Sequence, residues 1–386
     1  MPKILVISFS PIVRDARVLR QLSLLTRLGD VSTIGYGEAP EGVQQHFRVP
    51  DGAASLPQTP LGVLKLALRA HRAVENTSPA ARAVLGMEIP DGWDLVVAND
   101  ARVLDLAFTL SKGAPVWADM HEWAPEERTH IRSWKYLVAP FMTELCRLYL
   151  PKAALVTTVG DEIAALYQTR FGVTPALMTN ATHFRELSPS PSVADRIRCV
   201  HSGAAIHGRG LERMVEVFRD LPERYSLDLY LVPGGDGGKH LATLREAAAN
   251  DPRITFHEPV APEALPTVLS AYDVGVFWIP PTHTNARLTL PNKFFDYVQA
   301  RLGVAIGPSI EMTRLLERFD LGVVSASFDE HDLRASLLDV TPERVEAFKR
   351  ASDVAARELS FENTEARIAP LVEALLDPVG PPAAES

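Results

Sequence analysis

Short apolar runs alternate with amphipathic stretches along most of the chain. KILVIS at 3–8 and DVSTIG at 30–35 are short and mostly apolar, whereas RVLRQLSLLTRL at 17–28 repeats apolar residues three and four positions apart. The first pattern is typical of buried strands and the second of helices. Because the two kinds of stretch alternate, the pattern predicts parallel sheets covered by helices.

The alternation runs through two successive series. The strand-like runs of the first series continue with DLVVAND, APVWADM, AALVTTV and PALMTN, and those of the second are RIRCVHSG, SLDLYLV, RITFHEP, DVGVFW, VAIG and LGVV. Between them, residues 184–198 are rich in Ser and Pro and lack a clear apolar period. We therefore predict an α/β protein of two Rossmann-like doubly wound domains facing a cleft, at residues 1–185 and 186–355.

Size and composition agree with two soluble domains. A chain of 386 residues exceeds one ordinary hydrophobic core, and a net charge of −9 argues against nucleic acid as a partner. Cys146 and Cys199 form no CxxC pattern, so we expect neither disulfides nor structural zinc, and a reducing cytoplasm. No apolar run is long enough to span a bilayer, and the N-terminus has no signal-peptide pattern. The final stretch DPVGPPAAES at 377–386 is expected to be a disordered tail.

The stretch LTLPNKFFDYVQARLGVAIG at 288–307 predicts a helix with polar groups at its start. Pro291 cannot extend a preceding helix and Asn292 is a good N-cap, so the helix should begin here. Three apolar positions then have the spacing of a core face: Phe295, Val298 and Leu302.

Asn292 and Asp296 are four residues apart and share one side of this helix with the free amides of its first turn. Together with Lys293 they form a set that suits a sugar nucleotide, with the Asp296 carboxylate accepting ribose hydroxyls. The alternative is that Asn292 only caps the helix and Asp296 only favours its dipole.

A glycine-rich loop in HSGAAIHGRGLE at 201–212 predicts an anion site. The strand should end near Ser202 and the next helix should start near Gly210, so that backbone amides at the helix start face a ligand. Arg209 would add a bidentate positive charge, or would be an ordinary solvated loop arginine. The glycines that allow a close backbone approach are Gly203, Gly208 and Gly210.

Taken in order, several motifs resemble the GT-B glycosyltransferases, and among them the large retaining family 4. They are RDARVLRQLSLLTRLGDVSTIG, DMHEWAPEE, TTVGDEIAALYQTRFGV with TNATHF, HSGAAIHGRGLERMVEVFRDLP, and HEPVAPEALPTVLSAYDVGVF followed by LPNKFFDYVQARLGVAIG. The resemblance implies an enzyme that moves a sugar from a nucleoside-diphosphate sugar to a hydroxyl-type acceptor, without a cofactor. The nucleotide (UDP, GDP or ADP) and the acceptor (small molecule, lipid carrier or glycan) stay open. The resemblance also implies that the last helix, at 356–376, crosses back to the first domain.

The family often has two cations near the diphosphate, one of them a few positions before Arg209. Alanines stand at 204 and 205 instead, so Lys293 is the preferred second cation. The other candidates for this role are His207 and Arg287.

Members of the family also carry two glutamates eight positions apart, the second of which binds the ribose. Asp296 stands at the second place, but Leu288 stands at the first, which leaves the sugar without its usual contact. Backbone amides are the expected substitutes, at Leu290, Asn292 and Lys293.

Two further loops are donor-site candidates. The resemblance places the nucleobase beside HEPV, with Glu258 and Val260 near it. The turn PGGDGG follows a predicted strand, and its Gly234 and Gly235 suit a tight turn beside a ligand, or a plain loop.

The acceptor side is expected at the ends of two strands of the first domain. Asn99 and Asp100 end one strand, and Asp119, His121 and Glu122 end the next. The resemblance implies that His121 bonds the donor sugar or the acceptor; the alternatives are a structural histidine, and a capping role for Asp100.

The resemblance implies that the leaving phosphate takes the acceptor proton while Arg209 and Lys293 hold its charge. No carboxylate pair suggests a covalent intermediate, and no DxD-like motif suggests a metal, so we expect activity in EDTA. The alternatives are an epimerase of the same fold and a non-catalytic nucleotide-sugar-binding protein. Residues 128–152 suggest weak peripheral contact with an anionic inner membrane surface. The alternative is a helix pair packed on the first domain, with Pro140 breaking any continuous amphipathic face. The basic residues of this stretch, against Glu144 alone, are Arg128, Arg132, Lys135, Arg147 and Lys152.

Overall fold

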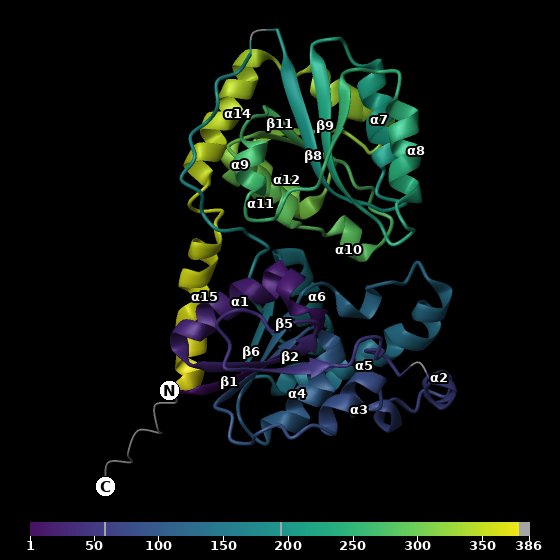
Figure 1. The fold of residues 1–386 in the computed structure, drawn as a ribbon, viewed down its shortest axis with the longest axis vertical. Coiled ribbons are helices and arrows are strands. Elements are labelled where there is room, and N and C mark those ends of the chain that lie inside the picture. The colour runs from purple at the N-terminus through teal and green to yellow at the C-terminus, as the bar shows by residue number, and fades with distance from the viewer. Residues whose placement is uncertain (58, 194, 378–386) are drawn as a thin grey trace. The chain divides into compact units, whose positions relative to one another are not determined.

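The structure is a computed structural model that describes residues 1–57, 59–193 and 195–377. The chain divides into two compact units (Figure 1). Unit 1 consists of Met1–Thr179, His283–Asn285 and the chain from Glu365 onward, and unit 2 consists of Asn180–Thr282 and Ala286–Thr364. Apart from Asp377, the expected disordered tail lies outside the described residues.

Unit 1 contains a parallel sheet whose strand order is that of a Rossmann domain. In the described part of the chain it has seven strands, in the order β3-β2-β1-β4-β5-β6-β7. The strands are β1 (Lys3–Pro11), β2 (Asp30–Tyr36), β3 (Gln45–Val49), β4 (Leu95–Asn99), β5 (Val116–Met120), β6 (Leu155–Thr158) and β7 (Ala176–Leu177). The helices are α1 (Ala16–Leu28), α2 (Pro60–Ala67), α3 (Pro79–Leu85), α4 (Leu104–Ser111), α5 (Ala139–Tyr149) and α6 (Asp161–Phe171).

Unit 2 repeats the same plan. Its sheet, again counted over the described residues, has six parallel strands in the order β10-β9-β8-β11-β12-β13. The strands are β8 (Ile197–Ala205), β9 (Tyr225–Pro233), β10 (Ile254–His257), β11 (Val274–Phe277), β12 (Gly303–Ile306) and β13 (Gly322–Val324). The helices are α7 (Leu211–Asp220), α8 (Lys239–Ala248), α9 (Leu265–Leu269), α11 (Asn292–Gln299), α12 (Ile310–Phe319), α13 (Glu330–Leu338) and α14 (Pro342–Ala355). Two helices, α10 (Thr284–Arg287) and α15 (Phe361–Leu376), contain residues of both units.

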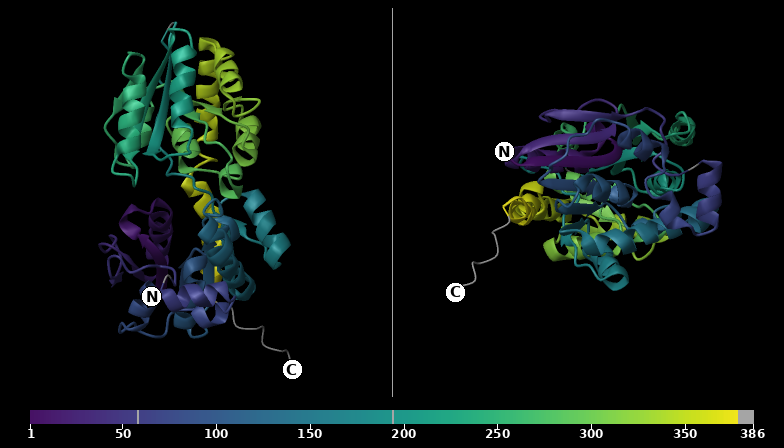
Figure 2. Two further views of the ribbon diagram at one scale, coloured as in Figure 1. Left: turned by 90° about the vertical axis from the view of Figure 1, so that its right-hand side faces the viewer. Right: turned by 90° about the horizontal axis from the view of Figure 1, so that it is seen from below.

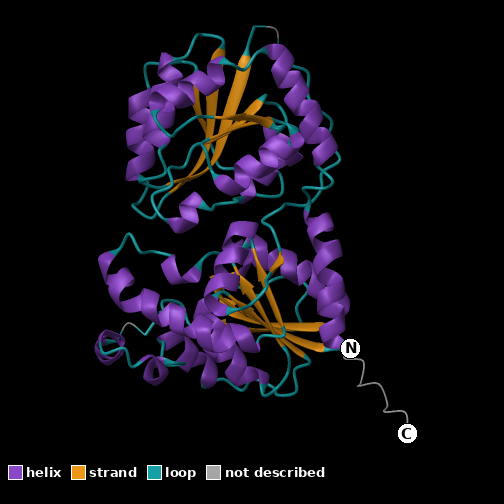
Figure 3. Cartoon of the chain, turned by 180° about the vertical axis from the view of Figure 1, so that it is seen from behind, coloured by secondary structure: helices purple, strands orange, loops and turns teal. Residues whose placement is uncertain are grey.

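Both sheets have helices on their two faces (Figures 2 and 3). In unit 2 the side chains of β8 alternate between two hydrophobic clusters, since Cys199 packs with α7 and α8 and Val200 packs with α11 and α12. Strands covered on both faces favour mostly apolar runs, as in KILVIS of unit 1 and DVGVFW of unit 2. The expected doubly wound α/β class is therefore confirmed for each unit.

Three local expectations need correction. Strand β8 continues to Ala205, three residues past Ser202, because it pairs along its whole length with β9. Helix α11 begins at Asn292 as expected, but its N-cap residue is Pro291. The expected helix pair is one continuous helical segment, since a π-helix at Trp134–Val138 leads directly into α5, and Pro140 lies in the first turn of α5.

None of the described helices combines the length and apolar character that a membrane span requires.

Candidate functional site

In unit 2, the end of the Lys293 side chain lies against the backbone of Gly203, where any side chain would force it to move. Gly203 is the seventh residue of β8 and has φ +156°. A Cβ atom at this position would lie 2.5 Å from Cε and 3.1 Å from Nζ of Lys293. The structure therefore brings together the glycine loop and the start of α11, two of the motifs from which the donor site was predicted.

Arg209 and Lys293 are two neighbouring cations, and among the described residues neither forms an ion pair. Burial lowers the pKa of Lys293, and the charge of Arg209 lowers it further, while Asp296 opposes both effects. Burial also lowers the pKa of Arg209. Within the described residues, neither side chain has a hydrogen bond or an ion-pair partner. Partly buried cations without a counter-ion favour binding of an anion, which would restore their charge balance.

His201 is a third member of this cluster, and sequence reasoning missed it. Its ring is 3% exposed, and Nδ1 lies 2.8 Å from the carbonyl oxygen of Val276. A carbonyl only accepts, so Nδ1 carries the hydrogen and Nε2 is left as an acceptor. Burial and then the charge of Lys293 lower the pKa of His201 to about 3, so the imidazole is neutral at physiological pH. A histidine inside the apolar run RIRCVHSG was the available signal.

Two helix starts contribute backbone amides. Helix α7 follows Gly210, which has φ +71°, and α11 follows Pro291; neither N-cap residue makes a side-chain cap hydrogen bond. The first amides of a helix lack the partner four residues back that later amides have, so a helix start suits an anionic ligand.

The remaining candidates on α11 differ in exposure. Asn292 is exposed, whereas the Asp296 side chain is buried at 7% exposure. Leu290 is buried, and its carbonyl oxygen accepts a hydrogen bond of 3.0 Å from Asn180 Nδ2.

The PGGDGG segment forms a tight turn after β9. A Cβ atom on Gly234 would lie 2.3 Å from the carbonyl oxygen of Ala205, whereas Gly235 faces open space, as does Gly208. Glu258 borders a hollow of about 310 Å³ and lies 3.8 Å from Arg245. Val260 is partly exposed.

In unit 1 the fully buried Asp119 is an anchor between three elements. Its carboxylate pairs with Arg17 of α1, with Nη2 to Oδ1 at 2.6 Å and Nε to Oδ2 at 2.7 Å. It also accepts hydrogen bonds from Gln21 and from Thr157 on the neighbouring strand β6. Burial alone would raise the pKa of Asp119, but the charges and hydrogen bonds of Arg17 and His121 together outweigh burial and lower it. A carboxylate used in this way is suited to positioning its neighbours.

His121 follows β5, and its ring is held by Asn99 and Asp119. Its Nε2 lies 3.0 Å from Asn99 Oδ1 and 3.4 Å from Asp119 Oδ2. Burial lowers the pKa of His121, but the hydrogen bond and charge of Asp119 more than offset this and raise it. No described residue bonds Nδ1. Asn99 and Asp119 are paired residues of β4 and β5, so parallel pairing brings these predicted residues together.

Asp100 and Glu122 belong to a group of three carboxylates with Glu127, whose oxygens lie within 4.8 Å of one another. Asp100 also caps the 3-10 helix Ala101–Val103, since it accepts a hydrogen bond of 2.9 Å from the Ala101 amide. Burial, and then the charges of Asp100 and Glu127, raise the pKa of Glu122 well above its usual range.

Comparisons with known proteins identify the fold. No protein-family model matches the sequence, and no curated protein matches it. Among solved structures, a sucrose-phosphate synthase from Thermosynechococcus elongatus superposes with a TM-score of 0.70 at 15% identity, over 97% of this chain and 99% of that one. HepE of Anabaena, in complex with UDP and glucose, superposes with a TM-score of 0.65 at 14% identity, over 97% of this chain and 100% of that one. An α,α-trehalose-phosphate synthase from Burkholderia vietnamiensis superposes with a TM-score of 0.66 at 12% identity, over 96% of this chain and 100% of that one.

At these identities the likeness establishes the fold. The chain has the GT-B fold of two Rossmann-like domains that these proteins share.

Proposed function

We propose that the protein is a glycosyltransferase that moves a sugar from a nucleoside-diphosphate sugar to a hydroxyl-type acceptor, with retention of configuration and without a metal. The observation that carries this proposal is the pair of neighbouring cations, Arg209 and Lys293, around Gly203 at the end of β8. The fold adds support, since the Anabaena protein of the same fold is described in complex with UDP-glucose.

The proposed chemistry uses these cations on the leaving group. When the bond between sugar and diphosphate breaks, negative charge grows on the departing phosphate oxygens. Arg209 gives two parallel N–H donors and Lys293 a point charge, and both act more strongly because they are partly withdrawn from water. His201 belongs to the same cluster, and its unprotonated Nε2 would give the Lys293 ammonium an acceptor if the side chain moved toward it.

The remaining donor roles follow from position. Asp296 would accept the ribose hydroxyls, and amides at Leu290, Asn292 and Lys293 would hold the sugar and phosphates, since a leucine at 288 replaces the family's glutamate. The loops with Gly234, Gly235, Glu258 and Val260 would enclose the nucleoside.

On the acceptor side, we assign the substrate contact to His121 through its Nδ1. Asn99 and Asp119 would act as positioning residues, because both hold the opposite ring nitrogen. Asp119 is unsuited to form a covalent intermediate, since its carboxylate is fully buried and bonded by Arg17, Gln21 and Thr157. This supports a mechanism in which the leaving phosphate itself takes the acceptor proton.

Unit 1 also has a surface suited to an anionic membrane. Helix α2 exposes Leu61 and Leu64, and its C-cap residue Leu68 is exposed as well. The next residue, Arg69, donates a hydrogen bond of 2.9 Å to the Tyr136 carbonyl oxygen. Apolar side chains interspersed with basic ones favour an anionic lipid surface. We expect co-sedimentation with anionic but not zwitterionic vesicles, lost when the three leucines are replaced by glutamine; binding that ignores the replacement would contradict this.

The reaction is tested with labelled UDP-, GDP- and ADP-sugars. A thermal-shift screen identifies the donor, because a ligand bound to the folded state raises the melting temperature. The labelled donor is then incubated alone and with sugar, sugar-phosphate and lipid-phosphate acceptors. We expect turnover only with an acceptor, in EDTA, and with retained configuration. Sugar isomerisation without an acceptor would indicate an epimerase, and binding without turnover would indicate a non-catalytic binding protein.

A further inference from the structure

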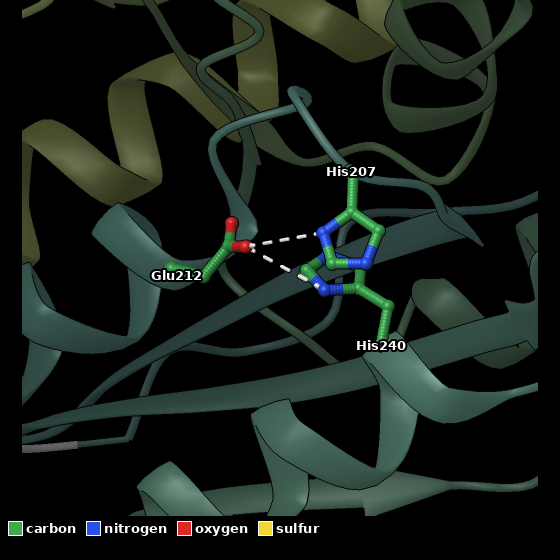
Figure 4. Close-up of side chains that lie close together, drawn as sticks. All are labelled: His207, Glu212 and His240. Carbon is green, nitrogen blue, oxygen red and sulfur yellow. Dashed lines mark ion pairs between the residues drawn. The ribbon is translucent and has the colours of Figure 1, made fainter. Parts of the chain in front are cut away.

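Two histidines and a glutamate converge beside the loop that carries Arg209. His207 lies in this loop, Glu212 is the second residue of α7, and His240 is the second residue of α8. One ligand atom from each lies within 4.8 Å of the others. Figure 4 shows the two imidazole rings one over the other and the Glu212 carboxylate facing both.

His240 is the informative member of the group. It is 1% exposed, yet neither of its ring nitrogens makes a hydrogen bond within the described residues. Its Nδ1 lies 3.5 Å from Glu212 Oε1. A buried imidazole with unsatisfied nitrogens is costly, and a ligand at this point would remove the cost.

The geometry suits a small divalent ion. The Glu212 oxygen lies 3.9 Å from Nδ1 of His207 and 3.5 Å from Nδ1 of His240. Ligands held about 2.0–2.1 Å from a tetrahedral Zn²⁺ are roughly 3.3 Å apart, so small side-chain movements would close the site. His207 is 70% exposed and free to make this movement.

A carboxylate lies behind His207, as is common for histidines that bind a metal. The second ring nitrogen of His207, Nε2, lies 3.7 Å from Asp236 Oδ2. Asp236 is itself held in place, since it accepts hydrogen bonds from the amides of Gly238 and His240. A carboxylate behind a ligating histidine fixes its ring orientation and strengthens its basicity.

We propose that His207, Glu212 and His240 form a binding site for Zn²⁺, with a water molecule in the fourth position. Two imidazole nitrogens and one carboxylate oxygen are ligands that Zn²⁺ accepts readily. His207 precedes Arg209 by two residues, so the bound ion would hold the Arg209 loop against α8. The ion would contact none of the reacting atoms of the sugar transfer, and the proposal does not depend on the proposed function.

The test uses the full-length protein freed of metal with a chelator and then titrated with zinc chloride by calorimetry. We expect one Zn²⁺ per chain, a rise in melting temperature, and slower amide exchange in residues 206–210. The variants His207→Ala and Glu212→Gln should each weaken binding at least tenfold. His207 and Glu212 are on the surface, so both variants should fold normally, which circular dichroism would verify.

The matched control is His331→Ala, because His331 is 91% exposed and lies beside Asp332 on α13. It should bind zinc like the unaltered protein. The proposal is overturned if the unaltered protein takes up no zinc, or if His207→Ala binds zinc with unchanged affinity.

Discussion

At the scale of single residues, the contact between Gly203 and Lys293 gives the sharpest test of the proposed diphosphate site. The φ of Gly203, +156°, disfavours a side chain, and a Cβ atom would collide with Cε of Lys293 at 2.5 Å. We expect Gly203→Ala to displace the ammonium and to lower the affinity for UDP at least tenfold, which is about 1.4 kcal/mol. Calorimetry of UDP binding measures this.

The control for this variant is Gly92→Ala. Gly92 has φ +79°, but a Cβ atom there would meet nothing within 4 Å. It should therefore carry the backbone strain, of order 1 kcal/mol, without changing UDP binding. Equal UDP affinity in both variants would refute the role assigned to the contact with Lys293.

The lowered pKa of His201 predicts that the free energy of unfolding depends on pH. This pKa is about 3 in the folded chain and about 6.5 when unfolded, so the unfolded state binds more protons between these values. The contribution to stability is therefore complete above pH 6.5 and is lost as the pH falls toward 3, at up to about 1.4 kcal/mol per pH unit. Urea unfolding from pH 7 to pH 4.5 should show a steeper loss for the unaltered protein than for His201→Asn. Parallel slopes would contradict the assignment.

At the scale of elements, the Asp119 anchor explains how α1, β5 and β6 are held in register at the site. Removing one partner of a buried ion pair leaves the other charge unsatisfied, which costs about 3–5 kcal/mol. We expect Asp119→Asn to lower the free energy of unfolding by about this amount, measured in urea.

An exposed pair provides the comparison. Asp51 pairs with Arg48 at the surface, where both side chains are more than half exposed. Asp51→Asn should cost less than about 1 kcal/mol. Similar losses in the two variants would mean that Asp119 is not the anchor described.

The elements themselves were largely predictable, because strands buried on both faces leave mostly apolar runs and helices leave a 3.6-residue period. The residues at which strands and helices end were harder to predict from the sequence. The extension of β8 to Ala205 depends on pairing with β9, which no local pattern reveals. Arg209 and Lys293 were paired beforehand only through the resemblance. The role of His201 was missed because it depends on burial and on the Val276 carbonyl, 75 residues away in sequence.

At the scale of the whole molecule, the chain is acidic, with a net charge of −9, yet the proposed donor site is basic. The positive charge is concentrated in one place, where burial and then the charge of Arg209 lower the pKa of Lys293. Since binding of a diphosphate would raise the pKa of Lys293 again, donor affinity should fall as the pH rises through its lowered pKa.

The most direct test of the central claim is calorimetric titration with UDP and with inorganic pyrophosphate, GDP and ADP being tried in turn as the nucleotide. The account predicts that Arg209→Ala and Lys293→Met each weaken both ligands at least tenfold, while the exposed Arg334→Ala leaves both unchanged. Asp296→Asn should weaken the nucleotide and spare pyrophosphate. Nucleoside-diphosphate and pyrophosphate binding that survive the loss of both cations would contradict the account.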